Sequence, residues 1–190
     1  MTKIDPGLVD GQSPRPRNLL ARWRADAKGV TAIEFGMVAM PFMMLLFGII
    51  GVGLYFFTTF TLENAVEQAS RLLRTGQAQV AGYTAAQFKA KVCEFVPGHI
   101  DCDGKVMVNV LAFADTTNVT ADALPRCLNA GGALSNANQF TLPGASEVVL
   151  VWVCYEWDLS AKIPFLNLGD MPNGSRLIQA TTVFRAEPYN

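Results

Sequence analysis

The sequence contains few of the side chains on which enzymes and metal sites depend. Histidine occurs once, at His99, and the four cysteines form no CxxC pair. A nucleophile elbow, a Walker loop, a dinucleotide-binding glycine pattern and a metal-ligand cluster are all absent from the sequence. The stretch from Asp101 to Lys105 begins like a calcium loop, but the later ligands are missing, so it predicts a turn. We therefore expect no catalytic residue, no metal and no cofactor, and no small-molecule substrate is evident.

Asp, Glu, Lys, Arg and His are all missing from the 28 residues from Phe35 to Leu62. A helix rises about 1.5 Å per residue, so roughly 20 apolar residues cross the hydrocarbon core of a bilayer. The run is too long for the roughly 7–15-residue apolar region of a secretory signal peptide. It predicts a transmembrane helix over about residues 35–58. A buried helix of a soluble protein is the alternative, which the length and the flanking residues disfavour.

Basic residues are concentrated before the apolar run. Residues 1–29 carry six Lys or Arg and three Asp, whereas residues 30–190 carry nine basic and thirteen acidic side chains. The positive-inside rule then places the N-terminus in the cytoplasm and the chain after about residue 62 outside. No basic face with interleaved aromatic residues follows the apolar run, so nucleic acid is not an expected partner.

The helix is expected to continue past the bilayer. Residues 62–73 carry apolar side chains at helical spacing, and Gly76 is a suitable residue to end the helix. We expect one long helix over residues 30–76 that is amphipathic beyond the transmembrane part.

Residues 77–190 are expected to form an α+β domain outside the membrane. Residues 84–98 predict a short second helix that has Phe88, Val92 and Phe95 on one side. Three strand-like runs rich in β-branched and aromatic residues follow, at 105–114, 147–159 and 176–187. The simplest arrangement is a small antiparallel sheet packed against the outer half of the long helix.

All four cysteines lie in this expected outer domain. An even number of cysteines in an oxidising compartment indicates two disulfides. Three pairings are possible, and the sequence does not choose among them. The pairing that we favour joins Cys93 to Cys102, which closes a short loop, and Cys127 to Cys154, which ties a loop to a strand.

One glutamate interrupts the apolar character at the start of the long helix. Glu34 is the fifth residue after Gly29 and is followed by Phe35, and Pro41 lies about two turns further along. A carboxylate at this depth in lipid is unfavourable by a few kcal/mol, so a compensating charge is expected. The alternative is a glutamate that lies at the headgroup boundary and is simply solvated. The proline predicts a kink in the helix.

The pattern around Gly29 resembles the cleavage site of type IV-like prepilins, which a membrane peptidase cuts after the glycine. Residues 24–77 as a whole resemble the TadE-like family, which comprises pseudopilins, or minor pilin-like proteins, of tight-adherence (Flp) pilus systems. The resemblance depends on Gly29, the Glu34-Phe35 pair and Pro41, and on the later sequence ASRLLRTG. It does not distinguish TadE from its sibling TadF.

The resemblance implies that a basic leader, residues 1–29, is removed and that Val30 becomes the new N-terminus. It also implies that Glu34 pairs with the amino terminus of a neighbouring subunit during assembly. The implied location is the bacterial inner membrane, crossed once, with a pilin-like domain in the periplasm. The implied partners are the prepilin peptidase, sibling pseudopilins, the pilus assembly platform and membrane lipid.

Two other functions are compatible with the same sequence. One is an uncleaved, signal-anchored periplasmic domain that binds a ligand or an envelope partner. The other, which has less support, is a membrane-tethered enzyme.

Overall fold

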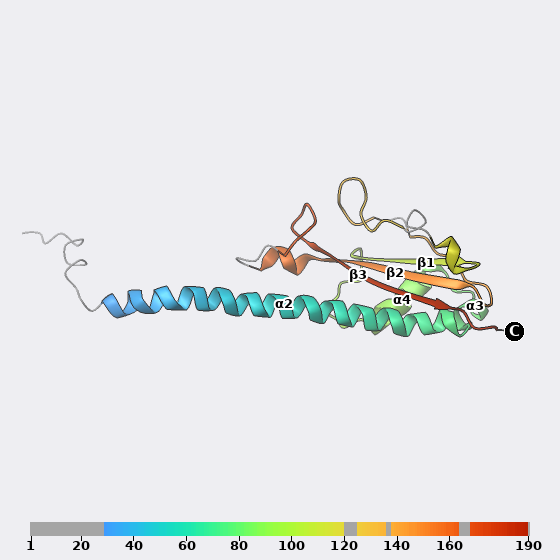
Figure 1. Cartoon of the computed structure of the whole chain (residues 1–190), viewed down its shortest axis with the longest axis horizontal. Helices are drawn as coiled ribbons and strands as arrows, with labels where there is room; N and C mark the ends of the chain where they lie inside the picture. Colours follow the sequence, from blue (N-terminus) through green and yellow to red (C-terminus); the bar gives the residue numbers. More distant parts are fainter. Residues whose placement is uncertain (1–28, 120–124, 136–137, 164–167, 190) are drawn as a thin grey trace, which may run out of the picture. The chain divides into compact units, whose positions relative to one another are not determined.

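The computed structural model describes residues 29–119, 125–135, 138–163 and 168–189. The predicted leader, residues 1–29, therefore lies outside the described residues except for Gly29. The chain divides into two compact units, residues 1–43 and 44–190. Helix α2 (Val30–Arg74) begins in the first unit and ends in the second, and the second unit contains all the strands (Figure 1).

Helix α2 is the predicted long helix. Within the described residues it is the one helix that is long and apolar enough to cross a membrane. The assigned helix continues through Pro41, and the predicted kink at this residue stays a prediction. In its second half, apolar residues at helical spacing become buried, among them Leu62, Val66 and Leu73. The helix thus changes from an apolar surface on all sides to a single buried stripe, as expected for a helix that leaves lipid and packs on a domain.

The end of α2 is fixed by a glycine. Gly76 has a φ of +76°, a left-handed conformation that other residues rarely adopt, and it separates α2 from the short helix α3 (Gln77–Val80). The backbone N–H of Thr75 donates to the carbonyl oxygen of Arg71 at 3.0 Å and closes the last turn. The predicted stop at Gly76 is confirmed.

Helix α4 (Ala85–Phe95) is the predicted second helix. Thr84 and Gln87 form a reciprocal capping box at its N-terminus, in which each side chain accepts a hydrogen bond from the backbone N–H of the other residue. Phe88 is completely buried, but Phe95 is 37% exposed. The spacing places Phe95 on the same side of α4 as Phe88 and Val92, but as the last helical residue it is only partly covered.

The three predicted strands form one antiparallel sheet. They are β1 (Val106–Phe113), β2 (Val148–Trp157) and β3 (Arg176–Arg185), in the order β1-β2-β3. β2 pairs with β3 over its whole length and with β1 from Val148 to Tyr155, and Trp152 lies opposite Asn109 on one side and Thr181 on the other. Because successive side chains alternate between the faces, this register determines which residues meet the helices.

One face of the sheet packs against α2 and α4 (Figure 1). The face contributes alternate residues of the central strand β2, from Val149 to Trp157, and the helices contribute Leu62, Val66 and Phe88. Fully burying one side chain of this kind stabilises a fold by about 1.5–3 kcal/mol. The α+β architecture with a small antiparallel sheet on the outer half of the long helix is confirmed.

The two favoured disulfides are both present. Cys93 at the end of α4 is bonded to Cys102, nine residues later, and Cys127 is bonded to Cys154 of β2, 27 residues later. Cys154 lies on the face of the sheet opposite the helices, where it packs with Met107. Each disulfide restricts the unfolded chain, an effect typically worth about 2–4 kcal/mol.

Candidate processing and assembly site

The predicted cleavage site, the peptide bond between Gly29 and Val30, lies at the start of α2. Gly29 directly precedes the helix and is exposed, and a Cβ built on it would meet no atom of the described chain within 4 Å. Val30, the first helical residue, is 52% exposed. Nothing in the described part of the chain therefore covers the peptide bond between the two residues.

Glu34 lies one turn further along α2. Residues four apart lie on the same side of a helix and differ in height by about 6 Å, so Glu34 shares a side with Val30. Glu34 and Phe35 are both exposed, and Phe35 is 73% exposed. No ion pair joins Glu34 to another of the described residues. The Glu34 carboxylate and the Phe35 ring are thus both accessible to lipid, solvent or another subunit at this end of the helix.

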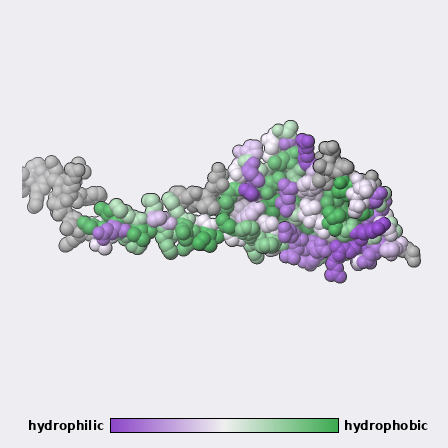
Figure 2. Space-filling view, in the orientation of Figure 1, coloured by the Kyte–Doolittle hydropathy of each residue, from purple (hydrophilic) through white to green (hydrophobic). Residues whose placement is uncertain are grey.

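The exposed surface of α2 is apolar until the domain begins. Most of the large side chains between Val30 and Ile50 are exposed, and Figure 2 shows this part of the helix largely in the green of hydrophobic residues. The first residue of α2 that the described chain buries is Gly51. A surface of this size and composition requires lipid or other helices around it.

Beyond Gly51 the helix belongs to the folded domain. A Cβ at Gly51 would lie 3.2 Å from Ile163 Cδ1, so glycine allows the chain after β2 to approach α2 closely. The Tyr55 ring lies 6.0 Å from the Trp157 ring, and the Arg176 guanidinium lies 5.3 Å from the Tyr55 ring centroid. These contacts attach the middle of α2 to β2 and β3.

The last turns of α2 are fixed by polar contacts. Glu67 accepts hydrogen bonds from Arg74 at 3.1 Å and from the hydroxyl of Thr182 on β3 at 3.0 Å. Arg74 also lies over the Phe184 ring at 5.0 Å, and its carbonyl oxygen accepts from the N–H of Glu187 at 2.8 Å. The contacts with Thr182, Phe184 and Glu187 join residues more than 100 positions apart, so no local pattern predicts them.

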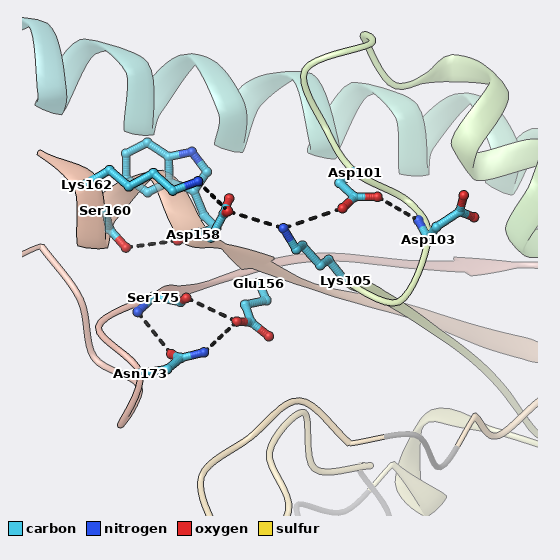
Figure 3. Close-up of polar contacts among 10 residues, drawn as sticks. Asp101, Asp103, Lys105, Glu156, Asp158, Ser160, Lys162, Asn173 and Ser175 are labelled. Atoms are coloured by element: carbon cyan, nitrogen blue, oxygen red, sulfur yellow. Dashed lines mark hydrogen bonds and ion pairs between the residues drawn. The ribbon is translucent and has the colours of Figure 1, made fainter.

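A chain of alternating charges lies where β2 enters the short 3-10 helix η4 (Asp158–Lys162) (Figure 3). Lys105 pairs with Asp101 at 3.4 Å and with Asp158 at 3.2 Å, and Lys162 pairs with Asp158 at 2.9 Å. The hydrogen bond from Lys162, and then that from Lys105, holds the pKa of Asp158 below its usual range. The hydrogen bond to Asp158 raises the pKa of Lys105.

The two lysines and the two aspartates of this chain therefore form ion pairs with one another. Asp101 and Lys105 lie in the turn that the sequence predicts, and the lysine lies between two carboxylates (Figure 3). In the part of the chain that the structure describes, no three His, Cys, Asp or Glu side chains come together in a group that could hold a metal ion.

A second polar group closes the turn before β3. Glu156 accepts hydrogen bonds from Asn173 at 2.7 Å and from Ser175 at 3.1 Å (Figure 3). Gly174 within this turn has a φ of +80°. The geometry is that of a turn fixed to its neighbouring strand.

The fold and the exposed N-terminal segment together define a class of protein: an α+β domain attached to one helix that is able to span a membrane. Comparison with protein families identifies the helix more closely. Residues 29–71 match the family of TadE-like proteins. The matched segment covers 43 of the 190 residues, begins at Gly29 and includes Glu34, Phe35 and Pro41.

The predicted resemblance to the TadE-like family is thereby confirmed for residues 29–71. No curated protein and no solved structure matches the chain.

Proposed function

We propose that this protein is a pseudopilin of a bacterial tight-adherence pilus system. A prepilin peptidase cuts after Gly29 and removes the basic leader, and α2 then begins at Val30 with a free amino group. The helix crosses the inner membrane once, and the domain that follows lies in the periplasm. The observation that carries the proposal is the family match that begins at Gly29 and contains an exposed glutamate one turn later.

The chemistry of assembly follows from the new amino terminus. An α-amino group is positively charged at neutral pH, and before cleavage the nitrogen of Val30 is an uncharged amide. An unpaired carboxylate inside a bilayer is unfavourable by a few kcal/mol on insertion scales. Glu34 of one subunit and the amino group of Val30 of a neighbour can compensate each other when the two helices are displaced by about one turn. Proteolysis would therefore create the partner that Glu34 requires.

The remaining partners follow from the same assignment. Sibling pseudopilins and the assembly platform would contact the exposed apolar side chains of α2, which are in lipid before assembly. The domain contributes no catalytic step in this proposal. Its role is to present a surface, attached to the helix by the Tyr55, Glu67 and Arg74 contacts, to other components of the pilus machinery.

The mass of the protein extracted from membranes tests the cleavage. A chain that starts at Val30 supports the proposal. A chain that retains residues 1–29 in cells with normal pili would overturn it in favour of an uncleaved anchor. A Gly29→Leu variant should retain the leader. Gly36→Leu is the control, because Gly36 is an exposed glycine of α2 outside the cleavage site, and this variant should be processed normally.

Substitution of Glu34 tests the assembly step. Glu34→Gln keeps the size and the hydrogen-bonding capacity of the side chain but removes the charge. We expect normal membrane insertion and normal cleavage but loss of pili. Glu63→Gln is the matched control, because Glu63 is an exposed glutamate on the same helix beyond the apolar run. Normal pili from the Glu34→Gln strain would contradict the proposed role of the charge.

A further inference from the structure

The base of the domain carries a set of exposed apolar side chains. We name Phe56, Phe57, Phe60 and Leu159 the collar; each is between 37% and 59% exposed. The three phenylalanines lie on α2, and Leu159 lies on η4. The residue before η4 is Trp157, whose ring packs on the Tyr55 ring.

Ring contacts hold the collar at the level of Tyr55. The Tyr55 and Phe56 rings are 5.4 Å apart, the Phe56 and Phe60 rings are stacked at 6.4 Å, and the His99 ring stacks on Phe57 at 5.3 Å. The rings of α2 thus contact one another, and the contact between Phe57 and His99 joins them to the domain. Large exposed apolar surfaces of this kind mark contacts with a partner or with a membrane.

Charged groups limit how deep this level can lie in a bilayer. The Arg176 guanidinium lies 5.3 Å from the Tyr55 ring centroid and pairs with Asp170 at 3.6 Å. Lys162 on η4 is 67% exposed as a side chain. Charged groups are costly in hydrocarbon, while aromatic rings and long basic side chains are common at the level of the headgroups. The level of Tyr55 therefore fits the headgroup region.

The domain also contacts α2 one turn closer to the N-terminus of the helix. Ile163 packs against Gly51, which precedes Tyr55 by four residues, or about 6 Å of helix. Interfacial segments typically insert about 5–10 Å, to the boundary between headgroups and acyl chains. Ile163 therefore lies at the depth expected of an apolar side chain that reaches the acyl chains.

We infer that the collar and Ile163 form a foot that seats the domain in the outer leaflet of the membrane. The inference rests on the membrane anchoring in the proposed function. The occupant is lipid, because the collar is continuous with the exposed apolar surface of α2 that crosses the bilayer. The 21 residues from Val30 to Ile50 would span about 32 Å as a helix, which matches a hydrocarbon core of about 30 Å. The outer hydrocarbon boundary then lies near Gly51 and not near residue 58.

Apolar contact, not charge attraction, drives this seating. The charged groups at this level pair with one another: Lys105 and Lys162 with Asp101 and Asp158 (Figure 3), and Arg176 with Asp170. A base of this kind is not the polybasic patch that selects anionic lipids. The foot would act as a depth stop that keeps α2 from sliding along the membrane normal.

Depth-dependent fluorescence quenching tests the foot with the full-length chain. A fluorophore is attached to Leu159→Cys, since the four native cysteines are paired. The protein is reconstituted into phosphatidylcholine vesicles that contain lipid with a nitroxide either on the headgroup or near the top of the acyl chain. Ile49→Cys on α2 is the membrane control and Val80→Cys on α3 the solvent control, because both side chains are exposed.

The expected result is quenching of the Leu159 label by about twofold or more, with the Ile49 label quenched and the Val80 label unaffected. Quenching at Ile49 but not at Leu159 would overturn the foot and leave the membrane anchor intact. No quenching at Ile49 would overturn the anchor itself, and the foot with it. The same vesicles with added anionic lipid form a second arm, and quenching of the Leu159 label in that arm alone would also overturn the apolar account. Phe56→Cys, five residues beyond Gly51 on α2, provides a second label site that tests the same prediction.

Discussion

Replacement of Gly76 by alanine would test how the end of α2 is joined to the domain. A Cβ at Gly76 would lie 2.7 Å from both Cβ and Cγ of Tyr189, closer than real Cβ atoms approach other heavy atoms. The Tyr189 hydroxyl donates to the carbonyl oxygen of Pro143 at 2.7 Å, so the ring is held and cannot simply move away. The added methyl group therefore meets a fixed neighbour.

Two effects add in this variant. Alanine with a φ of +76° costs about 1–2 kcal/mol, part of which the reduced entropy of the unfolded chain offsets. Overpacking against Tyr189 costs a further 1–3 kcal/mol or so. Gly82→Ala is the matched control, because Gly82 has a φ of +62° but has no atom within 4 Å of its Cβ position. The difference between the variants should be about 1–3 kcal/mol, which is the overpacking contribution alone.

The measurement is thermal or urea unfolding of the full-length protein in a mild detergent, followed by tryptophan fluorescence. For a chain of this size each kcal/mol lowers the melting temperature by about 2–4 °C. In a Tyr189→Gly background, Gly76→Ala should cost no more than Gly82→Ala, because the clashing atoms are gone. Equal destabilisation by the two single variants would refute the contact between the end of α2 and the C-terminal segment.

Three further predictions concern the domain. Phe88→Ala should lower the free energy of unfolding by about 3–5 kcal/mol, because Phe88 is completely buried, whereas Phe95→Ala should lower it by about 1 kcal/mol or less in the same urea titration. Thr84→Ala should cost about 1 kcal/mol through loss of the capping box, and Thr84→Ser should recover most of it. Lys162 lowers the pKa of Asp158 from its ordinary value of 3.8, so the stability from this pair is present above about pH 4 and is lost as the pH falls through the lowered pKa of the folded state. Asp158→Asn should therefore flatten the acid limb of the stability–pH profile, and an unchanged acid limb would contradict this pairing.

The long helix and the signal before it could be predicted because they depend on local sequence. A run of 28 residues without Asp, Glu, Lys, Arg or His favours an apolar environment wherever it lies in the fold. The pattern from Gly29 to Phe35 depends only on spacing along the chain, and the family match begins at Gly29. The stop at Gly76 depends on the backbone conformation that glycine allows at that position.

The strands could also be predicted, since β-branched and aromatic residues alternate along them. Their pairing order was the simplest arrangement for three strands and is the one observed. The disulfides were different: three pairings satisfied the sequence equally, and only the register that brings Cys154 beside the loop of Cys127 decided between them.

The sequence by itself determined where α2 ends and which of its parts is apolar, because both depend on neighbouring residues. Only the tertiary structure decided where the domain meets the helix. Ile163 on Gly51 and Arg176 over Tyr55 join residues more than 100 positions apart. Such contacts follow from the shape of a packed core, in which every side chain is placed by all the others, and no local pattern records them.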